Sequence, residues 1–184
     1  MRAYISLLAS ALLLTACAEY PTSYSTSFNN QRTLDTIKTS QSQQIKMSVG
    51  VLQDKDNRNK LICRGNSSIV LWPEAETFVH YIQEAIISEL KADNGFSWSS
   101  PKQLNGQLDT ISFQGGAFNQ TTWVIRMTFY DKNNKPFTVT SVFPFAADVK
   151  DKRFCEHVSS AFPSAVENFI NQLFKNPKFQ QFLK

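Results

Sequence analysis

Acidic residues and a histidine recur at helical spacing in one segment, a pattern that could hold a metal ion or perform acid–base chemistry. Glu76, His80 and Glu84 are four residues apart, so a helix would place them on one face. The same spacing is typical of exposed polar stripes, in which each ion pair contributes only about 0.2–0.5 kcal/mol. We favour the exposed stripe and predict no catalytic and no metal-binding residue in it.

Two further clusters carry reactive side-chain types. Cys155 and His157 suggest a cysteine nucleophile with its general base, but residues so close together on a helix do not face each other. Asp54, Asp56 and Asn57 suggest the start of a calcium loop, yet the glycine and the distal glutamate of such a loop are missing. We therefore predict a protein that is not an enzyme and that uses no cofactor.

The N-terminal sixteen residues are typical of a cleaved targeting segment. Arg2 is followed by an apolar run, "AYISLLASALLL", and then by small residues. The run is shorter than the roughly 20 apolar residues that span a bilayer. The sequence "LTAC", which ends at Cys17, resembles the bacterial lipobox. This resemblance implies cleavage after residue 16 and acylation of Cys17; the alternative is an ordinary secretory signal with an incidental cysteine.

The lipobox resemblance also bears on location and partners. Ala18 stands where an aspartate would favour retention in the inner membrane, so in a Gram-negative host the resemblance implies an outer-membrane lipoprotein that faces the periplasm. Stable anchoring takes two or more acyl chains. We expect the membrane and an envelope protein as partners. Removing Arg2 from 19 basic and 15 acidic residues leaves a net charge of +3, too mild and too scattered to predict nucleic-acid binding.

Composition divides the mature chain into two parts. Residues 17–43 carry the lipidated cysteine and then a polar stretch without sustained periodicity, which predicts a flexible tether. Its aromatic residues Tyr20, Tyr24 and Phe28 leave open that part of it docks on the domain. Residues 44–184 have the length of one domain.

Cys63 and Cys155 remain once Cys17 is acylated. An even pair in an exported domain favours a disulfide. Closing a loop of about 90 residues would stabilise the domain by roughly 4–5 kcal/mol on the chain-entropy model. Two buried thiols, or a metal site shared with His80 and His157, are the alternatives, although the spacings are unlike those of a zinc motif.

Periodicity predicts an α+β domain with the order β-β-α-β-β-β-α. Alternation of Ile45, Met47, Val49 and Val51 predicts the first strand. Residues 61–72 form one bent strand or two short ones, and further strands are predicted at 103–114, 121–131 and 136–146. A helix is predicted at 73–93, ending at Asn94–Gly95, and a last helical region from residue 152 is split by Pro163. A short terminal helix follows, with Asn176 as its cap and Pro177 at its first position. Consecutive strands between helices predict an antiparallel sheet with two helical regions packed on one face.

Several segments together resemble the YajG-like bacterial lipoproteins. They are Cys17, the strand "SVGVLQDKDNR" with Asp56 and Arg58, the segment "SSIVLWP" before a helix, "ELKADNGF" and the closing "NPKFQQFL". The resemblance covers roughly residues 44–184 and implies location and fold but no activity. We expect a lipid-anchored, non-enzymatic binding or structural domain. The alternative is an accessory lipoprotein of an envelope transport system that binds lipid or another small ligand.

Overall fold

The computed structural model describes residues 19–23, 46–65, 67–72, 77–115, 120–130 and 135–183. The elements in chain order are β1 (Glu19–Ser23), β2 (Ser48–Gln53), β3 (Lys60–Arg64), β4 (Ser67–Trp72), α2 (Phe78–Ala92), β5 (Gln103–Gly115), β6 (Gln120–Tyr130), β7 (Pro136–Ala146), α3 (Phe154–Lys175) and α4 (Pro177–Leu183). The predicted α+β class and order are confirmed, with the second predicted strand divided into β3 and β4. The predicted signal segment 1–16 and Cys17 lie outside the described residues.

The strands form two sheets rather than one. The large sheet has the order β2-β5-β6-β7 and the small sheet has the order β1-β4-β3. Neighbours are antiparallel except for β2 with β5 and β1 with β4. Both exceptions join strands that are far apart in the chain, as parallel pairing requires. The predicted antiparallel character is thus confirmed for most pairs, whereas the division into two sheets was not foreseen.

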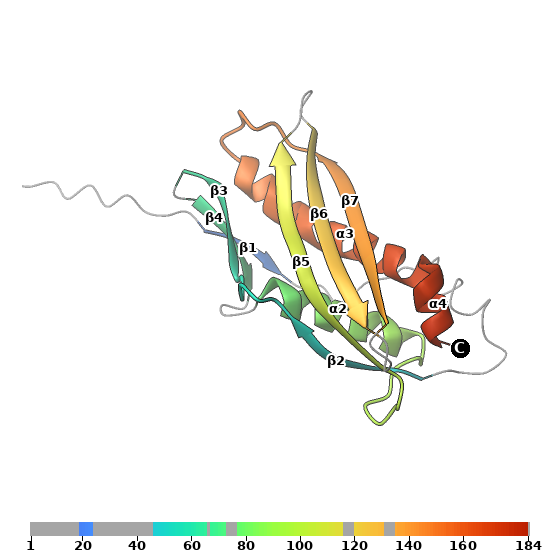
Figure 1. Cartoon of the computed structure of the whole chain (residues 1–184). Coiled ribbons are helices and arrows are strands. Elements are labelled where there is room, and N and C mark those ends of the chain that lie inside the picture. The colour runs from blue at the N-terminus through green and yellow to red at the C-terminus, as the bar shows by residue number, and fades with distance from the viewer. Residues whose placement is uncertain are drawn as a thin grey trace, which may run out of the picture.

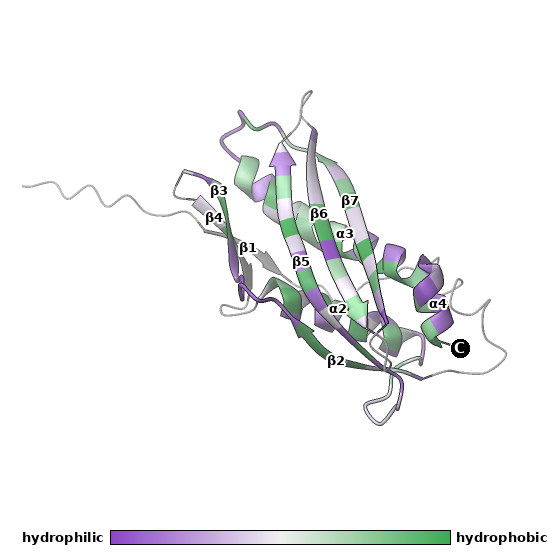
Figure 2. Ribbon diagram, in the orientation of Figure 1, coloured by the Kyte–Doolittle hydropathy of each residue, from purple (hydrophilic) through white to green (hydrophobic). Residues whose placement is uncertain are grey.

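Helix α3 is the element that links the two sheets. It packs against β6 and β7 of the large sheet and against β1 and β4 of the small sheet, while α2 contacts β2 and α3 (Figure 1). Both helices therefore cover the same face of the large sheet, as predicted. Along β5–β7 the hydropathy alternates from residue to residue (Figure 2), the pattern of a sheet with one buried face.

The core combines aliphatic and aromatic side chains from both helices and the large sheet. The buried side chains include Phe78, Ile82, Ala85, Ile86 and Leu90 of α2, Trp123, Ile125, Met127 and Phe129 of β6, and Val166, Phe169, Ile170 and Leu173 of α3. Each set recurs at the period of its element, which is why these contacts follow from the sequence.

Strand β2 departs from the predicted alternation. Met47 and Val49 are buried, but Val51 is 62% exposed and Leu52 is buried instead. The pairing with β5 shifts register between Val49 and Leu52, the signature of a β-bulge, in which one extra residue reverses the faces that follow. A side chain at Gly50 would collide with Asn105, so the bulge forms where only glycine fits.

Both ends of α2 differ from the prediction by a few residues. The helix begins after Thr77, whose side chain accepts a hydrogen bond from the backbone N–H of His80 at 3.2 Å. A threonine that caps in this way is a better start signal than Pro73, which lies outside the described residues. At the other end Asn94, not Gly95, adopts the left-handed conformation (φ 56°). Gly95 N–H then bonds the Leu90 carbonyl at 2.8 Å, as in a Schellman motif.

The C-terminal helices show that proline does not always end a helix. α3 continues through Pro163, so the predicted split there is wrong. The lost backbone hydrogen bond is offset by the buried neighbours Phe162, Ala165 and Val166. The break comes at Asn176, whose side-chain oxygen accepts from Lys178 N at 2.9 Å and caps α4 as predicted.

Strand β1 lies inside the segment expected to be a tether. Glu19–Ser23 pairs in parallel with Ser68–Trp72 of β4 and lies against α3. Among the features of the sequence, only the aromatic residues Tyr20, Tyr24 and Phe28 indicated that this segment could dock. None of the described helices is long and apolar enough to cross a membrane.

Candidate functional site

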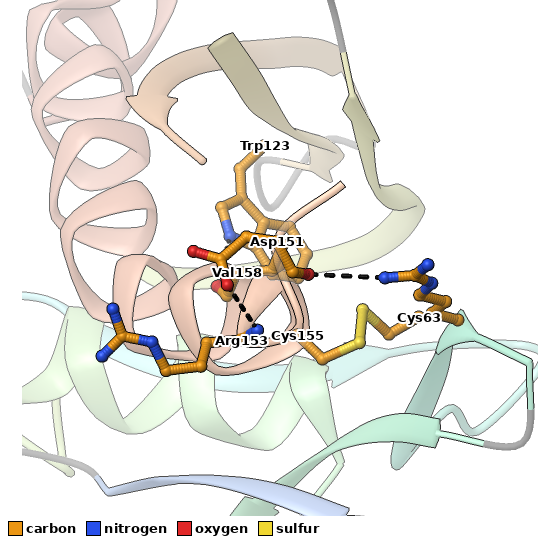
Figure 3. Close-up of a disulfide and its surroundings, with 7 residues drawn as sticks. Cys63, Trp123, Asp151, Arg153, Cys155 and Val158 are labelled. Atoms are coloured by element: carbon orange, nitrogen blue, oxygen red, sulfur yellow. Dashed lines mark hydrogen bonds between the residues drawn. A yellow bond between two sulfur atoms is a disulfide. The ribbon is translucent and has the colours of Figure 1, made fainter. Parts of the chain in front are cut away.

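Cys63 and Cys155 form a disulfide with their Cα atoms 5.8 Å apart (Figure 3). This separation is within the usual range for a disulfide, so the predicted bond is confirmed, and the free-thiol and metal alternatives are wrong. The bond joins β3, an edge strand, to the first turn of α3. Its sulfur atoms are therefore unavailable as nucleophiles or ligands.

The surroundings of the disulfide fix the segment before α3. Arg64, next to Cys63, donates to the backbone oxygen of Asp151 at 3.4 Å. The Asp151 carboxylate accepts from Arg153 N–H at 2.8 Å. This bond, with the nearby charges of Arg153 and His157, holds the pKa of Asp151 below its ordinary value. The Trp123 indole donates to the Val158 carbonyl at 3.0 Å, which ties α3 to the large sheet (Figure 3).

The suspected catalytic pair near the start of α3 is not assembled. Cys155 is bonded to Cys63, so it has no thiol for a neighbouring base to activate. His157 instead faces Asp151, with 3.5 Å between Nε2 and Oδ2. This arrangement is a polar side-chain contact at the helix start.

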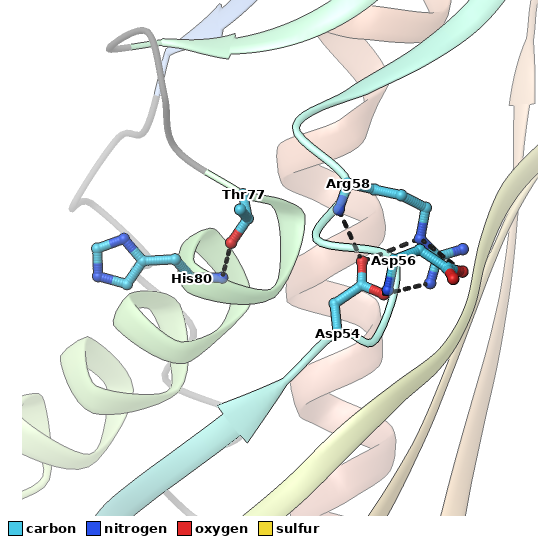
Figure 4. Close-up of polar contacts among 5 residues, drawn as sticks. All are labelled: Asp54, Asp56, Arg58, Thr77 and His80. Carbon is cyan, nitrogen blue, oxygen red and sulfur yellow. Dashed lines mark hydrogen bonds and ion pairs between the residues drawn. The ribbon is translucent and has the colours of Figure 1, made fainter.

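The loop between β2 and β3 is organised around one carboxylate (Figure 4). Asp54 accepts from Nε and Nη2 of Arg58 at 2.9 and 3.0 Å, a bidentate pair. It also accepts from the backbone N–H groups of Asp56 and Arg58. Asn57 adopts a left-handed conformation (φ 46°) to complete the turn. The Asp54 carboxylate, the first that a calcium loop would offer, is therefore already engaged by Arg58 and the loop backbone.

The pKa of Asp54 agrees with a structural role for its carboxylate. Burial raises the pKa of Asp54, but the hydrogen bonds from Arg58 and from the backbone outweigh it and hold the pKa below its ordinary value. The carbonyl of Arg58 in turn accepts from Phe78 N–H at 3.0 Å. The loop therefore positions the start of α2 relative to the sheet. Asp56, the residue that the family resemblance emphasised, lies 3.8 Å from Arg58 and is half exposed.

The predicted polar stripe on α2 lies partly outside the described residues, since Glu76 is among those not described. His80 Nε2 and Glu84 Oε1 are 3.7 Å apart, with both side chains 48% exposed. His80 also lines a depression of about 430 Å³ with residues of the β2–β3 loop, such as Asp54 and Asn57. Within the described ranges no group of three or more metal-binding side chains comes together.

Sequence reasoning missed one group of chemical interest, Glu89. Its side chain is 2% exposed, and neither carboxylate oxygen has a hydrogen-bond partner. Burial, reinforced by the charge of Glu167 on α3, raises its pKa to about 7. The available signal was its position, since Glu89 stands four residues after Ala85 and three after Ile86, within the apolar stripe of α2.

A second depression, of about 350 Å³, lies between α4 and the start of β7. Its lining combines basic and aromatic side chains and consists of Lys135, Pro136, Phe137, Lys178, Gln181 and Phe182. No motif pointed to it, because these residues come from two distant segments.

Comparison with known proteins gives a fold but no family. No family model and no curated protein matches the sequence. XCC0632 from Xanthomonas campestris, described by the family model DUF330, superposes with a TM-score of 0.52 at 8% identity, over 70% of this chain and 81% of that one. PelC from Paraburkholderia phytofirmans, a dodecamer, matches with a TM-score of 0.31 at 11% identity, over 69% and 86%. The chain therefore shares its fold with XCC0632.

Proposed function

We propose that this protein is a lipid-anchored envelope lipoprotein whose domain binds or supports an envelope protein and does not catalyse a reaction. The observation that carries the proposal is the Cys63–Cys155 disulfide, because such bonds persist in oxidising compartments. The apolar N-terminus and the lipobox-like "LTAC" also support export. Since the disulfide uses both other cysteines, Cys17 is the single thiol left for acylation.

We further propose that the protein is related to the YajG-like lipoproteins and resides in the outer membrane. The support is the set of matching segments in the sequence, Ala18 after the proposed acylation site, and a fold shared with another bacterial protein, XCC0632. The loop from Asp54 to Arg58, part of that resemblance, acts as a structural brace. The resemblance therefore supports a common scaffold.

Acylation is tested by metabolic labelling with a palmitate analogue in a Gram-negative host, followed by membrane fractionation. Cys17→Ser should abolish both labelling and membrane association. The matched control is the double variant Cys63→Ser, Cys155→Ser, which removes the other two cysteines and should stay labelled. Label retained by Cys17→Ser would refute the anchor, and separation of inner from outer membrane tests the location.

The depression between α4 and β7 favours a second candidate, an accessory subunit that binds an amphiphilic ligand. Lys135 and Lys178 there supply positive charge, and Phe137 and Phe182 supply apolar surface. This combination suits a lipid with an anionic headgroup. Native mass spectrometry of the purified protein should then detect a bound phospholipid that Phe182→Ala loses, whereas Val142→Ala on the open sheet face keeps it. Absence of bound lipid from both the parent protein and Val142→Ala would reject the ligand-binding candidate.

A further inference from the structure

Taking the proposed lipid anchor as given, we infer that one end of the domain lies directly on an anionic phospholipid surface. This anchor end consists of the hairpin between β3 and β4 and of residues 148–153, which precede α3. The domain would then be held against the bilayer and would not extend from it on a long tether.

The position of β1 supplies the first step. Glu19 begins β1 and pairs with Ser68, and the neighbouring residue Ser67 pairs with Arg64 across the hairpin. Cys17 is two residues before Glu19, and two residues of extended chain span at most about 7 Å. An acyl chain on Cys17 would therefore begin within about 7 Å of Glu19, the residue of β1 that pairs beside the hairpin.

The electrostatic range makes this distance decisive. The potential of an anionic bilayer decays over about 8 Å at physiological salt. A free coil of about 26 residues, as the sequence predicted, has an r.m.s. length of nearly 30 Å and would keep the domain beyond that range. With β1 paired, the linker is short enough for charged side chains at the anchor end to interact with the surface.

The exposed side chains of the anchor end fit an anionic surface. Four basic side chains, Arg64, Lys150, Lys152 and Arg153, are exposed, against the three acids Asp148, Asp151 and Glu156, which leaves an excess of one positive charge. The half-buried Asp148 and Asp151 accept hydrogen bonds from backbone groups of their own segment. Each basic residue near such a surface contributes about 1 kcal/mol. Apolar side chains complete the surface, since Ile62 is 77% and Val149 44% exposed.

Two links make these separate segments one unit. The disulfide joins β3 to α3, and Arg64 donates to the Asp151 backbone, so the hairpin and residues 148–153 keep their relative positions (Figure 3). The basic side chains are therefore presented together without an ordering cost at the membrane.

The test is lysine footprinting of the purified acylated protein on vesicles that contain phosphatidylglycerol. The non-acylated Cys17→Ser chain, free in solution, is the reference for each lysine. Acetylation of Lys150 and Lys152 should slow about fivefold or more on vesicles, which corresponds to the free energy of one basic contact. Lys91 and Lys175, in the last turns of α2 and α3, should be labelled as in solution.

A charge-reversal pair separates attraction from mere proximity. Arg64→Glu with Arg153→Glu should restore labelling of Lys150 and Lys152, whereas the control Lys91→Glu with Lys175→Glu should not. Acylated protein that fails to float with vesicles would refute the anchor itself. Three results would overturn the membrane-facing surface and leave the anchor standing: equal labelling at both ends of floating protein, protection only of Lys91 and Lys175, or protection that survives Arg64→Glu and Arg153→Glu.

Discussion

Strand β6 of the large sheet and strand β3 of the small sheet bury their side chains to very different degrees. In β6 of the large sheet Trp123, Ile125, Met127 and Phe129 are at most 1% exposed. In β3 of the small sheet no side chain is buried, and exposed residues alternate with partly buried ones. A strand of eleven residues can pack a long row of apolar side chains against the helices, whereas a strand of five residues cannot. Strand β3 is instead joined covalently to α3 by the Cys63–Cys155 disulfide.

This difference divides the stability of the domain between two physical sources. Ordering a residue costs about 1–2 kcal/mol in backbone entropy, which the large sheet offsets by burying aromatic surface. Strand β3 buries no side chain, so the disulfide that limits its freedom has more influence there. Changes in the core of the large sheet should therefore unfold the whole domain, and loss of the disulfide should act first on the small sheet.

The largest effect is expected from Trp123→Ala. The indole packs against Phe113 and Phe162, with ring centroids 5.3 and 5.1 Å apart, and donates to the Val158 carbonyl. Removing it should cost about 3–5 kcal/mol, the usual range for a buried aromatic residue. Chemical denaturation should show this loss as one transition. The control Val142→Ala, on the exposed face of β7, should change stability by less than about 0.5 kcal/mol. A loss as large as that of Trp123→Ala would show that the buried face of the large sheet is not the main source of stability.

Removing the disulfide should be the next largest change and should have a different spatial pattern. Cys63→Ser with Cys155→Ser should cost about 2–4 kcal/mol. Hydrogen exchange followed by mass spectrometry should show faster exchange in β3 and β4, with β6 and β7 close to the parent. Uniformly faster exchange in all strands would show that the two sheets unfold as a single unit.

The same contrast explains which parts of the fold were predictable. Long elements repeat their pattern often enough to be recognised, and the buried faces of β6, α2 and α3 follow directly from residues such as Trp123, Ile82 and Phe169. The bulge after Val49 was not predictable, because the alternation in the sequence continues through Val51 while the register does not. It depends on how closely Asn105 of β5 approaches Gly50.

Tertiary pairings were the harder part of the prediction. The disulfide followed from cysteine count and export, but the pairing of β1 with β4 did not, because Glu19–Ser23 has no alternating pattern. Continuation of α3 through Pro163 likewise depends on burial of its neighbours. Glu89 was overlooked because a glutamate in a helix is ordinarily exposed, although its position within the apolar stripe of α2 indicated burial.

Glu89→Gln should stabilise the α2–α3 side of the large sheet in a pH-dependent way. The pKa of Glu89 is about 7 in the native state, above the ordinary value of 4.5. The native state thus retains a proton that the unfolded chain releases, so stability should fall as pH rises from about 4.5 to 7 and stay constant above. The full effect is at most about 3 kcal/mol.

The measurement for Glu89 is the free energy of unfolding at several pH values. Glu89→Gln should flatten the slope and be more stable than the parent by about 1–3 kcal/mol above pH 7. Glu84→Gln, an exposed change on the same helix, is the control and should keep the parent's slope. A slope shared by all three proteins would mean that Glu89 is not the group responsible.

The smallest effect concerns the loop that connects the two sheets. Asp54→Asn removes the charge of the carboxylate that bonds Arg58 through two atoms, while an amide oxygen can still accept from the backbone. We expect a loss of about 1–2 kcal/mol near neutral pH. Because the native pKa of Asp54 lies below 3.8, its contribution is present above that pH and is lost as pH falls through the native pKa. The free energies of unfolding of the parent and of Asp54→Asn should therefore converge in acid.

Asp56→Asn is the matched control, since the Asp56 carboxylate is 52% exposed and 3.8 Å from Arg58. This substitution should cost less than about 0.5 kcal/mol. If both variants lose equal stability, the loop depends on overall charge, and the bidentate pair is not what connects the two sheets.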